Sequence, residues 1–310
     1  MTKYTGLLAS IRVVAVLIGF GCSSENDSNF AVVTPYASLT LVSDLHNDVS
    51  ETSGLANVDG KIYTHNDSGA PALLYEINAS TGDVVRTIIV NGASNQDWED
   101  LACDDTHLYI ADSGNNLGSR TDLKIYKILK SDLATQDSVN AEEIAFSYAD
   151  QTTFAYAPFT TPYDAEALIA YKGQLYIFTK NWADYSSKVY SVPTVPGSYV
   201  VTSVGEKALD VMVTGAAVDG VGSSVALVGY TNPYDPAIAF KSMIVILSGF
   251  TGNDLFSGDI ASYQIVDSQS VGQFEAILFN TPSELYLTAE GVTVQPVEYP
   301  AKLYKTEIPE

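Results

Sequence analysis

The chain is poor in the residues that form disulfides and zinc sites. It contains two cysteines and three histidines among 310 residues, and the histidines are scattered. This scarcity argues against a zinc site, because zinc is bound by closely spaced Cys and His ligands. Cys103 lies in the apolar segment 101–103, and we predict that its thiol is buried and unreactive. The other cysteine, Cys22, lies near the N-terminus, so we expect no disulfide within the folded domain.

Basic residues are also few. The sequence has 15 Lys and Arg against 37 Asp and Glu, which gives a formal net charge of −22. A surface of this charge repels nucleic acid and anionic membranes, so we expect no nucleic-acid partner. The same charge suits cation binding and solubility outside the cell. Charged residues make up only 17% of the chain and hydrophobic residues 46%, which excludes a disordered protein and allows a sizeable core.

The apolar run near the start of the chain is too short to span a bilayer. It covers residues 13–20, whereas a membrane helix needs about 20 apolar residues. Lys3 and Arg12 supply the positive charge that is typical of a signal peptide. Gly21-Cys22 then resembles the lipobox of bacterial lipoproteins, in which the cysteine is acylated and becomes the first residue. An ordinary signal peptide that is cleaved nearby is the alternative.

We therefore predict a lipoprotein signal peptide over residues 1–21, a lipidated tether over 22–36 and a folded domain over 37–310. The acylated Cys22 would hold the domain on a lipid membrane of the cell envelope, outside the cytoplasm, in the outer membrane or at the cell surface. Removal of residues 1–21 takes away one Lys and one Arg, which leaves 13 basic residues against 37 acidic ones. The formal charge of the mature chain is then −24 (13 minus 37).

What the sequence does contain is a repeat of five units. Each unit opens with a carboxylate or hydroxyl residue and a short apolar strand, and a turn and a second strand of the Leu-Tyr type follow. We call the opening residues the anchors; they are Ser53, Glu99, Glu166, Thr214 and Glu275. A third strand is predicted at residues 73–77, 123–128, 188–192, 243–247 and 302–305, and a fourth at residues 84–90, 144–148, 199–204 and 260–266.

Four antiparallel strands per unit are the composition of a propeller blade. The fifth unit ends after its third strand, and residues 37–42 alternate between apolar and polar, so we expect them to supply the missing strand and close the ring. The predicted fold is all-β: a single β-propeller, expected to be monomeric, with five blades of four antiparallel strands. Six blades would require another blade in one of the long gaps, which contain no further Leu-Tyr pair.

The anchors point to a metal. The first strand of each blade lines the propeller axis, so Glu99, Glu166 and Glu275 would face one another with Ser53 and Thr214. Three like charges in a narrow channel are unfavourable unless a cation lies between them. A hard cation with oxygen ligands, above all Ca²⁺, is expected outside the cell. The alternatives are that the carboxylates cap loops, bind backbone amides of neighbouring blades or share a proton.

Three of the blade openings resemble known propeller families. Residues 51–55 (Glu-Thr-Ser-Gly-Leu), 98–102 (Trp-Glu-Asp-Leu-Ala) and 274–277 (Phe-Glu-Ala-Ile) are similar to openings in SdiA-regulated propellers and in the phytase-like (esterase-like) group. The order of anchors also resembles the five-bladed, calcium-activated apyrases. That resemblance implies an axial Ca²⁺ held by all five anchors. The apyrases have an arginine after the acidic pair of the first blade, where this chain has Ser68-Gly69, which argues against a nucleotidase.

The ends of the second strands suggest a ligand pocket beside the channel mouth. Asp67, Asp112 and Glu290 are candidate acids or bases, and Lys180 and Arg120 are candidate anion clamps. Such a set suits a small polar ligand, a sugar (glycan) or a phosphoester. The alternative is that these residues serve only the turns. Three functions remain open: a binding propeller with Ca²⁺, a Ca²⁺-dependent phosphoester or ester hydrolase, and a lactonase-like enzyme.

Overall fold

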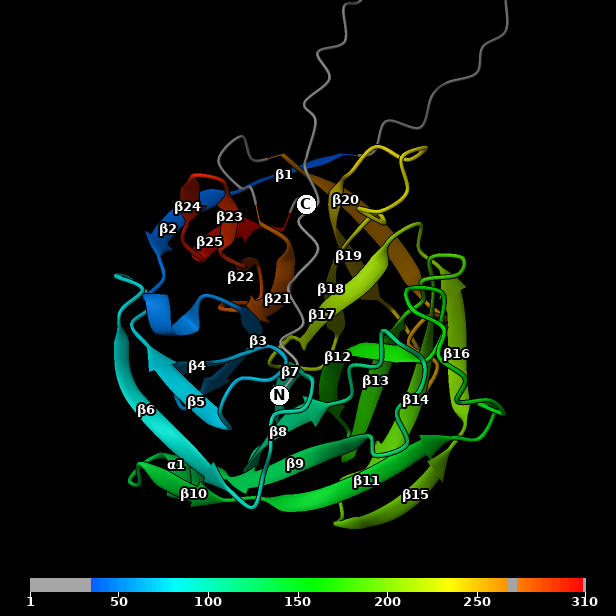
Figure 1. The fold of residues 1–310 in the computed structure, drawn as a ribbon, viewed down its shortest axis with the longest axis horizontal. Coiled ribbons are helices and arrows are strands. Elements are labelled where there is room, and N and C mark those ends of the chain that lie inside the picture. The colour runs from blue at the N-terminus through cyan, green and yellow to red at the C-terminus, as the bar shows by residue number, and fades with distance from the viewer. Residues whose placement is uncertain (1–34, 267–271, 309–310) are drawn as a thin grey trace, which may run out of the picture. The chain divides into compact units, whose positions relative to one another are not determined.

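A computed structural model of the chain describes residues 35–266 and 272–308 (Figure 1). The predicted signal peptide and residues 22–34 of the predicted tether lie outside these ranges, so the acylation of Cys22 stays a prediction. Within them, no helix is both long enough and apolar enough to cross a membrane. Helical structure in the described residues is confined to η1 (Asn47–Val49) and α1 (Lys130–Leu133).

Five antiparallel blades surround a common axis, which confirms the predicted five-bladed, all-β propeller. The innermost strand of each blade lies against the innermost strands of both neighbours, so the ring is closed. Blade 1 consists of β3 (Thr52–Val58), β4 (Lys61–Asn66), β5 (Leu73–Ile77) and β6 (Val84–Asn91). Blade 2 consists of β7 (Trp98–Cys103), β8 (His107–Asp112), β9 (Lys124–Leu129) and β11 (Glu142–Tyr148). Blade 3 consists of β12 (Asp164–Tyr171), β13 (Gln174–Lys180), β14 (Ser186–Pro193) and β16 (Ser203–Ala208).

The last two blades join the two ends of the domain. Blade 4 consists of β17 (Met212–Val218), β18 (Ser224–Tyr230), β19 (Ser242–Ser248) and β20 (Asp259–Val266). Blade 5 consists of β21 (Phe274–Phe279), β22 (Glu284–Ala289), β25 (Lys302–Glu307) and β2 (Thr40–Asp44). Between β22 and β25 the chain forms a separate hairpin of β23 (Val292–Val294) and β24 (Val297–Tyr299).

The closing strand differs from the prediction in one respect. β2 pairs antiparallel with β25, with Thr40 opposite Lys305, and so completes blade 5 as expected. Residues 36–38, however, form the separate strand β1 (Tyr36–Ser38), which pairs parallel with β20 of blade 4. The predicted strand 37–42 is therefore two strands on two blades. Its alternating pattern continues through Leu39, so the sequence does not mark the point at which the chain changes sheets.

Two further edge strands were not predicted. β10 (Ser138–Asn140) pairs parallel with β6 of blade 1, and β15 (Gly197–Val201) pairs parallel with β11 of blade 2. The prediction of residues 199–204 as the fourth strand of blade 3 is therefore wrong for residues 199–201, which belong to β15, whereas residues 203–204 do lie in β16 at the edge of blade 3. Together with β1, these strands cover the outer edges of three blades, which would otherwise present unpaired backbone groups.

The recurring Leu-Tyr pair holds adjacent blades together. Neighbouring residues of a strand point to opposite faces of the sheet. In β8, Leu108 belongs to the core cluster that contains Tyr63 of blade 1, while Tyr109 belongs to the cluster that contains Leu175 of blade 3. All four side chains are fully buried. Each pair thus fills the cores on both sides of its blade, which explains why the pattern repeats along the chain.

Candidate functional site

Every innermost strand carries a β-bulge at its anchor. In β7, for example, the register passes from Trp98 opposite Asp112 to Leu101 opposite Ile110, so that Glu99 and Asp100 leave the ladder. The corresponding interruptions in the other four blades fall at Ser53, Glu166, Thr214 and Glu275. A bulge redirects the side chain of the unpaired residue. The repeated sequence at the start of each unit therefore corresponds to a β-bulge, which directs the five anchor side chains out of their sheets at equivalent positions.

The two hydroxyl anchors bind the neighbouring blade. The Ser53 hydroxyl donates to the carbonyl oxygen of Glu99 at 2.5 Å, and the Thr214 hydroxyl donates to the carbonyl oxygen of Phe274 at 2.7 Å. Both residues are buried, and neither lines the cavity formed by the other anchors. Their hydrogen bonds link blade 1 to blade 2 and blade 4 to blade 5.

The three carboxylate anchors converge on one acidic cavity. Its volume is about 130 Å³, and it lies where the innermost strands begin. Of the residues that the structure describes, six carboxylates line it: Asp67, Asp97, Glu99, Glu166, Glu275 and Glu290. Among the described residues, the one basic side chain in its wall is Lys180. The cavity therefore brings together residues from two predicted sets. Its wall contains three of the predicted catalytic candidates (Asp67, Lys180 and Glu290) and three of the predicted metal ligands (Glu99, Glu166 and Glu275).

The other two catalytic candidates lie outside this cavity. Arg120 pairs with Asp112 at 2.9 Å between Nη2 and Oδ1, and it also donates to the carbonyl oxygen of Gly114. A further bond runs from its Nε to Asp122 at 3.1 Å. These contacts hold the loop after β8 in place, which agrees with the alternative that this segment serves the turn.

Lys180 is held by a buried network that crosses three blades. Its Nζ donates to both oxygens of Glu166, at 2.7 and 2.9 Å, and to the Tyr230 hydroxyl at 3.0 Å. The Tyr230 hydroxyl in turn donates to Glu275 at 3.0 Å. Burial acts to lower the pKa of Lys180, but the carboxylate of Glu166 and the other anions nearby raise it well above its ordinary value. The lysine is therefore charged and fully engaged.

No basic side chain of the described residues pairs with a second group of acids in the cavity. One oxygen each of Asp67, Asp97 and Glu99 lie within 4.8 Å of one another, and Glu99 forms a similar group with Asp164 and Glu166. Carboxylate oxygens are the ligand atoms that a hard cation such as Ca²⁺ prefers, and three at this separation could hold one. We call Asp67, Asp97 and Glu99 the acidic triad.

Sequence reasoning missed Asp97 and Asp164. Each lies two residues before an anchor, in the pattern Asp-x-Glu at 97–99 and again at 164–166. That repeated pattern was the available signal. The two residues differ in role, because the oxygens of Asp164 already accept bonds from the Asn115 backbone N–H and from Trp182 Nε1, at 2.5 and 2.7 Å. Asp164 thus orients Trp182, while Asp97 belongs to the acidic triad.

Burial and mutual repulsion raise the pKa values of these acids. Burial first, and then the charges of neighbouring carboxylates, raise the pKa of Asp97 to about 8. Burial also raises the pKa of Asp67 to about 6 and that of Glu275 to about 7, and it raises the pKa of Glu99 well above its ordinary range. Without a cation, some of these groups therefore carry a proton at neutral pH.

We expect the metal-free protein to lose stability as the pH rises from about 5 to about 8. Asp67, Asp97 and Glu275 have higher pKa values when folded than when unfolded, so the folded state binds more protons in this window and is destabilised as they leave. The check is a series of thermal melts in chelator across this range. A melting temperature that stays level or rises between pH 5 and 8 would contradict the expectation.

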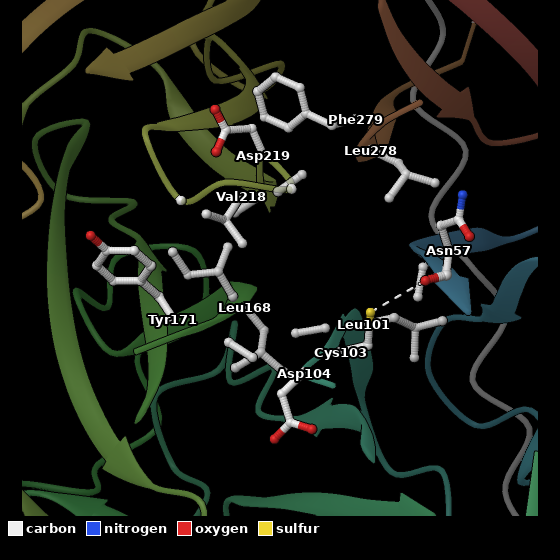
Figure 2. Close-up of a pocket in the computed structure, with 18 of the residues that line it drawn as sticks. Asn57, Leu101, Cys103, Asp104, Leu168, Tyr171, Val218, Asp219, Leu278 and Phe279 are labelled. Carbon is white, nitrogen blue, oxygen red and sulfur yellow. Dashed lines mark hydrogen bonds between the residues drawn. The ribbon is translucent and has the colours of Figure 1, made fainter. Parts of the chain in front are cut away.

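A second, larger cavity lies at the other end of the innermost strands (Figure 2). Its volume is about 860 Å³, and its walls are largely apolar, with Leu101, Leu168 and Leu278 among them. Cys103 lies in its wall and is partly buried, short of the full burial that was predicted for its thiol. Its Sγ donates to the carbonyl oxygen of Asn57 at 3.3 Å, and burial raises the pKa of the thiol. The predicted lack of reactivity remains a prediction.

Asp100 joins three blades near the axis. Its carboxylate accepts backbone N–H bonds from Leu101 and Leu168 at 2.8 Å each and from Ala216 at 3.1 Å. Burial raises the pKa of Asp100, and these three donors act in the opposite direction. These contacts show that Asp100 holds three blades together. Binding to backbone amides of neighbouring blades was the alternative considered for the carboxylate anchors, and here the residue after the anchor Glu99 has that role.

Comparison with known proteins adds no activity to this picture. No protein-family model and no curated protein sequence matches the chain. A crystal structure of Myxococcus xanthus glutaminyl cyclase is similar, with 11% identity and a TM-score of 0.49, over 89% of this chain and 100% of that one. Two glucose dehydrogenase structures have 8% and 9% identity and TM-scores of 0.47 and 0.48, over 88% of this chain and 99% of each of theirs. Likeness at this level says nothing about what the chain binds.

Proposed function

We propose that this protein is a Ca²⁺-binding β-propeller that holds a small polar ligand, a sugar or a phosphoester, at the mouth of the acidic cavity. The observation that carries the proposal is the acidic triad, whose oxygens lie within 4.8 Å of one another. Asp67, Asp97 and Glu99 would hold the ion. The proposal includes the lipid anchor at Cys22 and a location in the cell envelope, which rest on the sequence.

The charge balance of the cavity favours a bound cation. Six carboxylates and one lysine give a formal charge of −5 when all are ionised (one minus six). Lys180 is committed to Glu166 and so leaves the triad uncompensated. A divalent cation offsets this charge with the oxygen ligands that it prefers.

The bound ion would also have room for a ligand. Ca²⁺ takes about six to eight oxygen atoms, and the triad supplies at most six, or three where each carboxylate gives a single oxygen. The remaining positions are available to water or to oxygen atoms of a ligand that enters the cavity. Bound in this way, the ion would polarise such an oxygen.

The enzymatic alternatives have less support. A phosphoester hydrolase would use Lys180 and Arg120 to bind the anion, but both are engaged with carboxylates in the described structure. Hydrolysis then depends on the ion together with Asp67 or Glu290 as the base. The lactonase-like function is associated with six blades, and this propeller has five.

Calorimetric titration tests the metal site directly. We expect chelator-treated protein to bind one Ca²⁺ per chain, and to bind Mg²⁺ much more weakly because Mg²⁺ demands a stricter octahedral geometry. Asp97→Asn should weaken Ca²⁺ binding at least about tenfold, a loss of about 1.4 kcal/mol. Glu142→Gln, at an exposed position on β11, serves as the control and should bind as the wild type does. Absence of saturable Ca²⁺ binding would rule the proposal out.

A further inference from the structure

Three aromatic side chains stand at the mouth of the acidic cavity. Phe159, Trp182 and Tyr234 all line it, and we call them the aromatic platform. The ring centroids of Phe159 lie 5.0 Å from Trp182 and 5.2 Å from Tyr234. Trp182 and Tyr234 are stacked, with 24° between their planes and 6.2 Å between centroids.

The platform has a fixed inner ring and two open outer rings. Trp182 is buried and is oriented by the bond from its Nε1 to Asp164. Tyr234 and Phe159 are 60% and 41% exposed. Phe159 lies in the long connection between β11 of blade 2 and β12 of blade 3, and Tyr234 lies in the connection between β18 and β19, which is longer than a simple hairpin needs. Exposed aromatic rings grouped beside a polar cavity mark a binding site.

The backbone holds one of these rings in a costly conformation. Phe159 has φ of +54°, in the left-handed region that a bulky residue rarely adopts. Its N–H donates to the carbonyl oxygen of Asn116 at 2.8 Å, which keeps the residue in place. Strain of this kind persists at sites where a side chain must be aimed at a ligand.

We infer that the aromatic platform and the acidic cavity bind the ring of a neutral sugar. The C–H face of a sugar ring stacks on an aromatic face, and its hydroxyl groups donate to carboxylates such as Glu290 and Glu275. This inference rests on the proposed function, because sugar hydroxyl oxygens would also occupy free positions on the Ca²⁺ ion. It narrows the proposed ligand from a sugar or a phosphoester to a neutral sugar.

The two other classes of ligand each meet a conflict at the platform. A phosphoester would meet six carboxylates and a lysine that is already paired. An alkylammonium ligand would compete with Lys180, whose Nζ already lies 4.9 Å from the centroid of the Trp182 ring and 5.1 Å from that of Tyr230. A ligand that carries hydroxyl groups and no charge avoids both conflicts.

The test is saturation-transfer NMR of the full chain with Ca²⁺ and a panel of neutral mono- and disaccharides, each at about 10 mM, a concentration that detects even weak binding. We expect at least one sugar to bind. Tyr234→Ala should weaken that binding at least tenfold while the calorimetric Ca²⁺ affinity stays within twofold. Tyr156→Ala is the matched control, because Tyr156 is 70% exposed in the same region and lies outside the cavity wall.

The outcomes separate this inference from the proposed function. Ca²⁺ binding without binding of any sugar would overturn the inference and leave the metal site standing. Sugar binding that persists in chelator and depends on Tyr234 would support sugar binding by the aromatic platform. It would also show that the Ca²⁺ ion takes no part in binding the sugar. Preferential binding of tetramethylammonium or of phenyl phosphate, tested as probes of the two other classes, would overturn the assignment to a neutral sugar.

Discussion

Ca²⁺ is expected to raise the melting temperature of the wild-type protein by about 5–10 °C, and Glu99→Gln is expected to abolish that rise. A ligand that binds only the folded state stabilises it by about 2.7 kcal/mol at a concentration 100 times its Kd. For a domain of this size each kcal/mol corresponds to about 2–4 °C. Glu99 belongs to both groups of clustered acids, so its loss removes a ligand that the others cannot replace.

The same substitution should have the opposite effect without the metal. Burial and the charges of Glu166 and Asp67 raise the pKa of Glu99, so its charged form is unfavourable in the empty site. A neutral glutamine of the same shape should therefore raise the melting temperature in chelator. Differential scanning calorimetry of wild type and variant, each with Ca²⁺ and with chelator, measures both effects.

The comparison distinguishes a metal ligand from a structural residue. A purely structural Glu99 would give a lower melting temperature in both conditions, and that result would contradict the assignment. Glu142→Gln is the matched control and should follow the wild type. Glu166→Gln should alter the response to Ca²⁺ less than Glu99→Gln does, because both Glu166 oxygens already bind Lys180.

Lys180→Met is expected to destabilise the metal-free protein by about 3–5 kcal/mol, the usual cost of removing one partner of a buried ion pair. The substitution leaves Glu166 buried without its cation and removes the donor to Tyr230. It also takes away the single positive charge that the described residues contribute to the cavity. Urea denaturation at pH 8 in chelator, where Glu166 is least readily protonated, measures the loss.

A second variant separates charge from packing. In Glu166→Gln/Lys180→Met neither charged partner remains, so most of the lost stability should return, as buried ion pairs are often replaced with little net cost. If the double variant is as unstable as Lys180→Met, the loss comes from poor packing of methionine, and the proposed role of the pair is wrong. Far-UV circular dichroism should show native strand content in both variants.

The architecture could be predicted because each blade is specified by local pattern. Leu108 and Tyr109 alternate along one strand, so they must face different neighbouring blades, and the same arrangement recurs at Leu175 and Tyr176. A repeat of this kind determines the number of strands per blade and the number of blades. The need to bury the edge of the last sheet then determines that the N-terminal segment closes the ring.

Only the tertiary structure decided which anchors face the cavity. The bulge is common to all five, but Ser53 and Thr214 find a carbonyl oxygen of the next blade within reach of their short side chains. The longer glutamates extend past that carbonyl into the cavity. Which partner a side chain meets depends on the neighbouring blade, and that neighbour is remote in sequence.

The sequence by itself determined a five-bladed, strongly acidic propeller with carboxylates around its axis, because strand periodicity and composition are local properties. The tertiary structure decided that Asp97 joins Asp67 and Glu99, that Lys180 is neutralised by Glu166, and that Phe159, Trp182 and Tyr234 meet at the mouth. These groups come from different blades and from loops without periodicity. Their proximity follows from closure of the ring, which no single segment encodes.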